Sequence, residues 1–263
     1  MNKLKDNWES GDPYEYFMGR WSKLMAPEFL NWLNLPYSLN WLEICCGTGA
    51  LSEAIFKYCK PSHLTCIDPS KEFLARAKVR LKNKGEFLVG SATDISNENN
   101  SIDMVVSGLT LNFIPNLESA LTEMIRISKP GGIIAAYVWD YSGRMDLLRY
   151  FLDAAILIDP NTRDLDEGVR FPICNIDNLK NAFQRAGLYE VEVTKLDINT
   201  LFKDFDDYWK PFLGGQGPAP SYLASLSENH QMELRKIIFN KLPVEPDGSI
   251  KLLGRAIAIK GKS

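Results

Sequence analysis

Short apolar runs alternate with amphipathic stretches between residues 41 and 139. The apolar runs predict five buried strands, at residues 41–46, 64–67, 86–89, 102–106 and 133–139. The amphipathic stretches predict helices over 50–60, 69–82 and 117–128, and Pro130 and Gly131 suit a tight turn before the last strand. Strands that alternate with helices form βαβ units, so this pattern predicts a parallel sheet with helices on both faces.

The alternation loosens beyond residue 140. There we expect helices over 144–158 and 177–186, with Gly187 at the end of the second, and strands over 189–198 and 250–259. About fifty residues separate these strands, which is far too many for a hairpin loop. The sequence therefore predicts a Rossmann-like α/β fold: a seven-stranded, mostly parallel sheet with helices on both faces and an inserted lid.

Helices are also expected ahead of the first strand. Asp12 is a suitable N-cap for a helix that has Pro13 at its first position and ends near Met25, after which Pro27 begins another. We accordingly expect three parts: N-terminal cap helices over 1–36, a Rossmann-like core domain over 37–198 and 250–263, and the lid over 199–249.

Three acidic residues lie where three successive strands should end. Glu43, Asp68 and Asp94 follow one another at intervals of about 25 residues, the length of one βα unit. Because the carboxyl ends of parallel strands meet at one edge of a sheet, the three carboxylates should converge there. Taken alone, Asp68 could cap a helix and Asp94 could be a loop residue, whereas Glu43 closes a buried strand and needs a partner there.

The residues around the first strand resemble a known family. The run 42–49, Leu-Glu-Ile-Cys-Cys-Gly-Thr-Gly, is similar to the acidic-x-Gly-x-Gly-x-Gly signature of class I methyltransferases that use S-adenosylmethionine (SAM). Cys45 occupies the first glycine slot, where its Cβ restricts positive φ. Residues 14–22, Tyr-x-x-Phe-Met-Gly-Arg-Trp-Ser, resemble a bacterial small-molecule branch, the methyltransferase type 11-like proteins. The similarity covers roughly residues 12–140 and continues in the last two strands.

This resemblance implies SAM as the cofactor, S-adenosylhomocysteine (SAH) as its product, and the core domain as the SAM-binding domain. Glu43 would act on the ammonium of SAM, Asp68 on the ribose hydroxyls, and Asp94 on the adenine. Arg20 would reach the carboxylate. The residues expected to bind the cofactor are Met18, Arg20, Glu43, Cys45, Gly47, Gly49, Asp68, Pro69, Thr93, Asp94 and Ser107.

The implied reaction is transfer of a methyl group to a small-molecule acceptor by in-line displacement. The sulfonium is already activated, so much of the acceleration can come from alignment, and a base matters only when the acceptor arrives protonated. His63 lies at the opposite sheet end, and helical spacing favours a packed face for His230. The remaining catalytic candidates are Asp140 and Tyr141, just past the fifth strand, which could equally be turn residues.

Aromatic residues crowd the first half of the lid. Aromatic walls with few polar groups suit a small organic ligand, so we expect Tyr208 and Trp209 to line the acceptor pocket. Packing of the lid onto the rest of the protein would explain each of these side chains equally well.

The composition of the chain limits the kinds of partner that the protein is expected to bind. Thirty basic and thirty-three acidic residues give a net charge of −3, so nothing in the charge favours nucleic acid or an anionic membrane. No apolar run approaches the roughly 20 residues that span a bilayer. Five cysteines without a Cys-x-x-Cys pair argue against a disulfide framework and against a metal site. We expect a cytoplasmic protein, either a monomer or a homodimer.

Three other functions share part of this pattern. An NAD(P)-dependent oxidoreductase has a similar glycine turn, but Ser52 stands in place of its third glycine and Glu43 would have no role. A nucleic-acid methyltransferase is disfavoured by the charge and by Ser107-Gly108-Leu109-Thr110, where amino-group methylases carry Asn/Asp-Pro-Pro-Tyr/Phe. A SAM-binding protein without turnover stays open.

Overall fold

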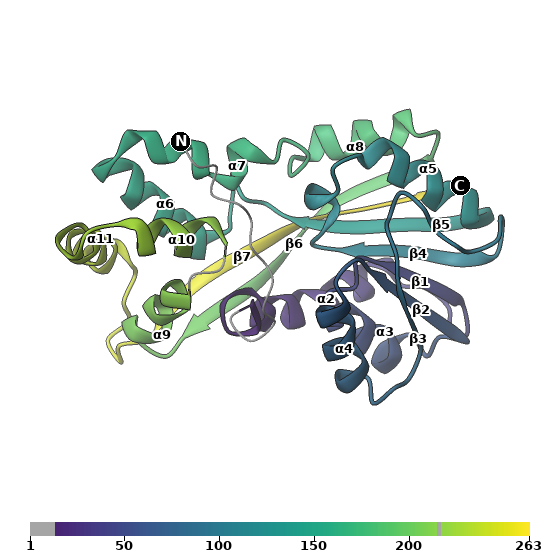
Figure 1. The fold of residues 1–263 in the computed structure, drawn as a ribbon, viewed down its shortest axis with the longest axis horizontal. Coiled ribbons are helices and arrows are strands. Elements are labelled where there is room, and N and C mark those ends of the chain that lie inside the picture. Colours follow the sequence, from purple (N-terminus) through teal and green to yellow (C-terminus); the bar gives the residue numbers. More distant parts are fainter. Residues whose placement is uncertain (1–13, 215–216) are drawn as a thin grey trace. The chain divides into compact units, whose positions relative to one another are not determined.

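The protein contains a seven-stranded sheet with the strand order β3-β2-β1-β4-β5-β7-β6 (Figure 1). Its strands are β1 (Asn40–Ile44), β2 (His63–Asp68), β3 (Glu86–Val89), β4 (Ile102–Gly108), β5 (Ser128–Trp139), β6 (Tyr189–Phe202) and β7 (Ile250–Lys262). The pairs β1–β2, β1–β4, β2–β3 and β4–β5 are parallel, and β7 runs antiparallel to β5. The predicted seven-stranded, mostly parallel sheet is therefore confirmed.

The computed structural model describes residues 14–214 and 217–263. These residues form two compact units. The first holds the described residues before Ser22 together with Asp140–Pro172 and Asp197–Arg255, and the second holds Ser22–Trp139, Ile173–Leu196 and Ala256–Ser263. The helix start predicted at Asp12 and Pro13 lies outside the described residues. The functional division into cap, core and lid stays a prediction.

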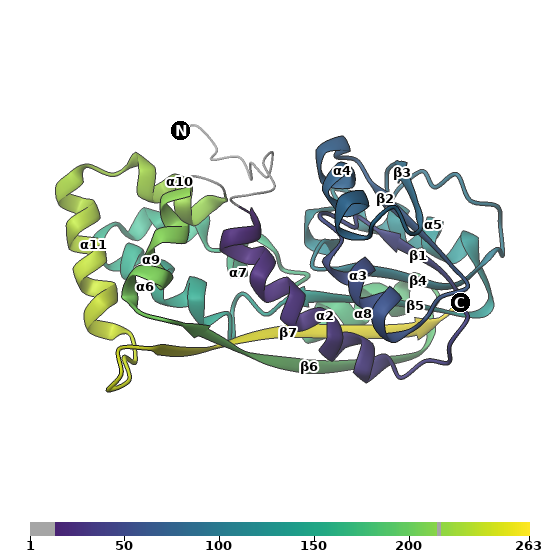
Figure 2. The ribbon, with the colours of Figure 1, turned by 90° about the horizontal axis from the view of Figure 1, so that it is seen from below.

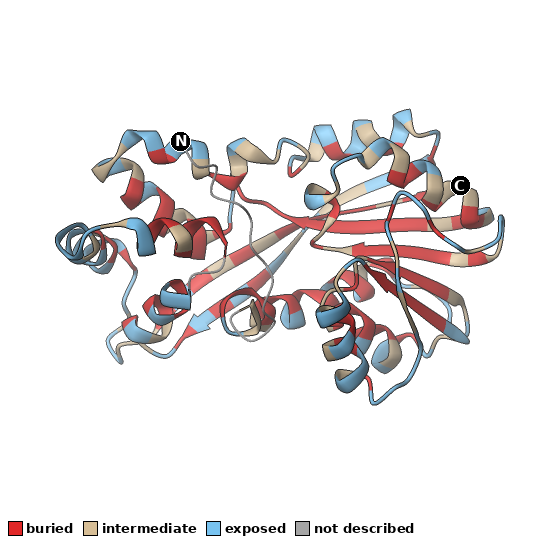
Figure 3. Cartoon of the chain, viewed as in Figure 1, coloured by how far each residue is buried: buried red, intermediate tan, exposed pale blue. Residues whose placement is uncertain are grey.

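In the second unit, helices cover both faces of the sheet. Helices α3 (Ala50–Tyr58) and α4 (Lys71–Arg80) lie on one face, and α5 (Leu117–Ile127) and α8 (Ile176–Arg185) lie on the other (Figures 1 and 2). Each connects parallel strands or follows them, as the alternation of patterns predicts. Strands β1, β2 and β4 are buried along almost their whole length, as Figure 3 shows.

The N-terminal helix does not break where the sequence predicts. A π-helical turn (Glu15–Gly19) leads directly into α2 (Arg20–Leu33), which continues through Pro27. The predicted end near Met25 is therefore wrong. A proline inside a helix removes one hydrogen bond. Here Met25 and Phe29 are fully buried on either side of it, and packing of this kind supplies most helical stability in proteins.

The tight turn predicted at Pro130 and Gly131 is also wrong. Both residues belong to β5, where the stretch between Ser128 and Ile133 forms a bulge against β4. The N–H of Gly131 donates to the carbonyl of Ser263, 2.8 Å away. The partner of this segment is thus the last residue of the chain, which no local pattern near residue 130 reveals.

The first unit is helical around an aromatic core. Besides the ends of β6 and β7, it contains α6 (Asp146–Ile158), η3 (Pro160–Leu165), α7 (Glu167–Arg170), α9 (Phe205–Trp209), η4 (Lys210–Gly214), α10 (Pro218–Ser225) and α11 (Glu228–Lys241). Phe151 and Phe212 stack with ring centroids 4.5 Å apart. His230 lies exposed in the first turn of α11, so the packed face predicted for it is wrong.

Gly49→Ala should destabilise the protein by about 2–4 kcal/mol, because positive φ strains alanine and overpacking adds to that strain. Gly49 has a φ of +83°, and a Cβ there would lie 3.0 Å from Leu81 and 3.1 Å from Ala77. Gly187→Ala is the matched control: its φ is +97°, but a Cβ would meet nothing within 4 Å. Urea unfolding should show the larger loss at Gly49, and equal losses would contradict the packing account.

Candidate functional site

Glu43 is a buried carboxylate in the interior of the sheet. Its side chain lies beneath α3, where it accepts a hydrogen bond from the Ser52 hydroxyl. Burial raises the pKa of the Glu43 carboxyl well above its usual range, and the bond from Ser52 opposes this effect. The same Ser52 replaces the third glycine of the dinucleotide pattern, so the sequence indicated this position without revealing its partner. A cationic group nearby would favour the ionised form of Glu43.

Asp68 joins the end of β2 to two neighbouring segments. Its Oδ2 accepts the N–H of Gly47 at 2.9 Å, and its Oδ1 accepts the N–H of Ser70 at 2.8 Å. Burial raises the pKa of the Asp68 carboxyl, while the two backbone hydrogen bonds lower it. The cap of α4 is Ser70, whose hydroxyl accepts the N–H of Phe73 at 3.2 Å. Asp68 is therefore not the helix cap that its sequence position allowed.

The loop after β1 contains three residues with left-handed backbone. Cys45 has a φ of +53°, so its side chain tolerates the conformation that the first glycine slot requires. A Cβ on Gly47 would meet nothing within 4 Å, whereas one on Gly49 would press on α4. Gly47 thus leaves open space beside Asp68, and Gly49 allows two helices to approach. Burial raises the pKa of the Cys45 thiol to about 12, so it stays protonated.

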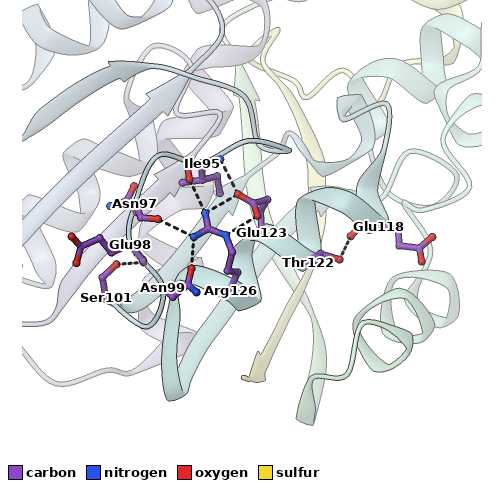
Figure 4. Close-up of polar contacts among 9 residues, drawn as sticks. All are labelled: Ile95, Asn97, Glu98, Asn99, Ser101, Glu118, Thr122, Glu123 and Arg126. Carbon is purple, nitrogen blue, oxygen red and sulfur yellow. Dashed lines mark hydrogen bonds and ion pairs between the residues drawn. The ribbon is translucent and has the colours of Figure 1, made fainter.

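The loop after β3 carries Thr93 and Asp94, both exposed, with the Asp94 N–H bonded to the carbonyl of Ser91 at 3.3 Å. Arg126 on α5 holds the residues that follow (Figure 4). Its guanidinium donates to the carbonyls of Ile95 and Asn97 at 2.7 and 3.0 Å.

Glu123 completes this attachment one helical turn before Arg126. Its carboxylate accepts the N–H of Ile95 at 2.9 Å and pairs with Arg126 at 2.7 Å (Figure 4). The hydrogen bond from Arg126 lowers the pKa of Glu123 to about 2. Neither residue was predicted from the sequence, although a Glu and an Arg three positions apart on a helix were a usable signal.

The end of β4 is held by hydroxyl groups. Ser107 is fully buried, and its Oγ lies 2.6 Å from Oγ1 of Thr110. Leu109, between them, has a φ of +62°. This strand end lies beside that of β1, at the point where the strand order reverses, which is where ligands bind in open α/β sheets.

Met18 and Arg20 belong to the first unit, and both pack against other residues of that unit. Met18 is buried, and Arg20 pairs with Asp207 at 2.8 Å. The guanidinium lies 4.2 Å from the ring centroid of Trp21 and 4.7 Å from that of Phe202. Its Nε and Nη2 atoms are buried and bond to no described residue. Arg20 therefore keeps two donors for an anion, and its expected role toward SAM stays a prediction.

Asp140 and Tyr141 are buried in a turn of the first unit. The backbone carbonyl of Asp140 accepts the N–H of Gly143 at 3.1 Å. The backbone N–H of Asp140 donates to the carbonyl of Arg255 at 2.9 Å. The Tyr141 ring lies 6.0 Å from that of Phe171. These contacts match the turn interpretation, and a catalytic role for either residue stays a prediction.

Tyr208 and Trp209 are buried in the aromatic core of the first unit. The Tyr208 hydroxyl donates to the carbonyl of Leu147 at 2.9 Å, and burial raises the pKa of this phenol well above its usual range. The Trp209 ring stacks on Phe205 with centroids 6.1 Å apart. Both arrangements match the packing interpretation, and the acceptor-pocket assignment stays a prediction.

The predicted cofactor residues of the second unit come together at one edge of the sheet. They are Glu43, Cys45, Gly47, Gly49, Asp68, Pro69, Thr93, Asp94 and Ser107. All lie at or just beyond the carboxyl ends of β1 to β4, which are neighbours in the sheet. Within residues 14–214 and 217–263, no three His, Cys, Asp or Glu side chains are grouped to hold a metal ion. No helix in these ranges could cross a membrane.

Comparison with known sequences finds a family match within the second unit. Residues 42–136 match a family model described as a methyltransferase domain. The demethylmenaquinone methyltransferase of Leptospira interrogans is 32% identical over 141 residues, which are 51% of this chain and 56% of that protein. That of Oceanobacillus iheyensis is 37% identical over 99 residues, 35% of this chain and 40% of that protein. The chain thus aligns with about half the length of these curated relatives.

Solved structures share the fold at low sequence identity. The YcgJ protein of Bacillus subtilis superposes with a TM-score of 0.58 at 17% identity, covering 93% of this chain and 98% of that one. Phosphoethanolamine N-methyltransferase 2 of Haemonchus contortus, in complex with SAM, gives a TM-score of 0.58 at 16% identity, covering 95% of this chain and 56% of that one.

Replacing Glu43 by Gln should change how stability depends on pH. The folded-state pKa of Glu43 is raised above 4.5, so the folded protein holds this proton more tightly than the unfolded chain. Its stability should therefore fall as the pH rises from about 4.5 through the folded-state pKa. Glutamine has no such proton, so the variant should gain about 1.4 kcal/mol relative to the wild type for each unit of pKa elevation.

The measurement is the free energy of unfolding in urea at pH 5 and pH 8. Glu118→Gln, at an exposed carboxylate on α5, is the matched control and should follow the wild type. An identical pH slope in Glu43→Gln and the wild type would show that Glu43 titrates normally.

Proposed function

Because the chain belongs to the class I SAM-dependent methyltransferases, we propose that it transfers a methyl group from SAM to a small-molecule acceptor and releases SAH. The observation that carries this proposal is the open space at Gly47, whose N–H donates to the buried Asp68 carboxylate, at the sheet edge where Glu43 is also buried. A Cβ on Gly47 would project into that space, so a ligand could approach the backbone there.

The residues of this site match the chemistry of SAM. Asp68 uses one acceptor position of each oxygen for a backbone N–H, and a carboxylate has about four such positions, so capacity is left for two ribose hydroxyls. Burial removes water from around Glu43, and a nearby ammonium group would stabilise its ionised form. Arg126 and Glu123 hold the residues that follow Asp94, so they would orient the Asp94 carboxylate toward the adenine. When bound, SAM supplies an activated methyl group on a sulfonium.

The acceptor is proposed only as a class. The relatives bear names that specify demethylmenaquinone and phosphoethanolamine, both small molecules. The nearly balanced charge of the chain also supports a small acceptor over nucleic acid. We place the protein in the cytoplasm, in keeping with five cysteines that are all free thiols.

The cofactor assignment is tested by binding. SAM and SAH should raise the melting temperature of the wild type, since a ligand selective for the native state must do so. Asp68→Asn keeps the shape of the side chain but loses its charge, and it should bind SAH about 10- to 100-fold more weakly, because hydrogen bonds to a charged acceptor contribute about 1.5–3 kcal/mol.

Ser70→Ala is the matched control for this experiment. It removes the cap of α4, at a cost of about 0.5–2 kcal/mol in stability, but leaves the Asp68 carboxylate in place. Calorimetry should therefore find normal SAH affinity in Ser70→Ala. A melting-temperature shift with NAD(P) and none with SAM or SAH would overturn the proposed function.

Trp209→Ala separates the two interpretations of the lid aromatics. If Trp209 lines the acceptor pocket, transfer of labelled methyl from SAM should fall strongly while SAH affinity changes little. If it is only a core residue, the variant should lose about 3–5 kcal/mol of stability, with activity and affinity falling together. Methyl transfer to a panel of small acceptors and urea unfolding decide between these outcomes. Full activity with full stability would rule out both interpretations.

A further inference from the structure

Asn112 has a buried side-chain amide that makes no hydrogen bond within residues 14–214 and 217–263. Its Oδ1 and Nδ2 atoms are both buried, and neither bonds to any residue that the structure describes. A primary amide offers two donors and an acceptor, and buried groups of this kind almost always have partners. Asn112 is therefore prepared for a partner that is not part of the described chain.

The position of Asn112 indicates what that partner is. It lies in a short helical turn, η2 (Leu111–Phe113), three residues beyond the end of β4. Strands β4 and β1 are neighbours, and the strand order reverses between them. The loop after β1 contains Gly47, so the two loops leave the sheet side by side at the place where open α/β sheets bind their ligands.

The turn that carries Asn112 is held firmly. Leu109 adopts a φ of +62°, and its N–H donates to the carbonyl of Tyr137 at 2.7 Å. The hydroxyls of Ser107 and Thr110 contact each other at 2.6 Å, and the N–H of Phe113 donates to the carbonyl of Thr110 at 2.9 Å. Left-handed backbone at a non-glycine residue is costly and tends to occur at functional sites. The Asn112 backbone is thus fixed before any ligand binds.

We propose that the Asn112 amide binds the methyl acceptor, an inference that rests on the proposed function. An amide can accept a hydrogen bond from a hydroxyl or N–H of the acceptor and donate one to an adjacent oxygen. It therefore selects an uncharged group that carries both, such as a phenolic or hydroquinone hydroxyl or an amine beside an oxygen. The cofactor residues assigned above match the charged and hydroxyl groups of SAM without Asn112, which leaves its amide for the acceptor.

The role of Asn112 is orientation. The nucleophile's electron pair forms a bond to the methyl carbon as the bond from that carbon to sulfur breaks, and sulfur keeps the second pair as the neutral thioether of SAH. The proton displaced from the acceptor passes to solvent, since an asparagine amide does not take it up. Holding the nucleophile in line with the methyl carbon is where much of the acceleration of such a reaction can arise.

The test compares Asn112→Leu with Asn40→Leu. Asn40 also has a buried amide with an unpartnered Oδ1, but its Nδ2 donates to Ser101 at 3.1 Å and it lies at the start of β1, the opposite end of the strand from the site. Asn112→Leu should reduce methyl transfer by about 10- to 100-fold, the loss expected for one or two hydrogen bonds, with unchanged SAH affinity. Its melting temperature should not fall, because no internal bond is lost.

A second variant at the same position keeps the test valid if Asn112→Leu does not fold. Asn112→Asp keeps the shape and an acceptor oxygen but loses the donor, so it should retain more transfer than Asn112→Leu. The assays use labelled SAM with reduced demethylmenaquinone, whose hydroquinone hydroxyls are uncharged, and calorimetry with SAH. Asn40→Leu should melt at a lower temperature and keep normal transfer per folded molecule.

Two results would overturn the assignment of Asn112: normal transfer by Asn112→Leu, or a parallel loss of SAH affinity, which would make the amide part of the cofactor site. A wild-type protein that transfers no methyl group counts against the proposed function instead. In that case the melting temperatures decide: a fall in Asn112→Leu as large as that in Asn40→Leu makes Asn112 a structural residue and refutes the proposal.

Discussion

The buried carboxylate of Asp68 is the interaction on which the candidate site depends. Its two oxygens accept the N–H groups of Gly47 and Ser70, so one side chain fixes both the loop after β1 and the start of α4. Burial alone would favour the protonated acid, and the two backbone bonds stabilise the anion against it. Glu43 lies in the adjacent strand, so two desolvated carboxylates lie at neighbouring strand ends.

Such an arrangement is costly for the protein alone. Each buried carboxylate loses the hydration of its charged form, and hydrogen bonds replace that hydration only in part. A ligand that brings positive charge and hydroxyl donors compensates for the remainder. The same reasoning applies to the unpartnered amide of Asn112, which lies beyond the neighbouring end of β4. The two buried carboxylates and the Asn112 amide thus lie at or beyond the carboxyl ends of neighbouring strands, where a bound ligand could compensate for their burial.

The surroundings of this edge are tied by interactions between distant parts of the chain. Arg126 and Glu123 on α5 hold the loop that follows Asp94, about thirty residues earlier (Figure 4). Gly49 lacks a side chain because α4 passes close to it. The Ser52 hydroxyl, on the next helix, donates a hydrogen bond to the Glu43 carboxylate. Each contact orders a segment that carries a predicted cofactor residue.

The sequence by itself determined the alternation of strands and helices, the seven-stranded sheet and the edge at which Glu43, Asp68 and Asp94 gather. These features follow from hydrophobic periodicity and chain connectivity, which are local properties of the chain. Only the tertiary structure decided that Pro27 stays inside a helix, that the segment around Gly131 bonds to Ser263, and that the Asn112 amide bonds to none of the described residues. Each of these depends on atoms far away in the sequence, and burial by such atoms sets both the stability of a helix and the demand of a polar group for a hydrogen bond.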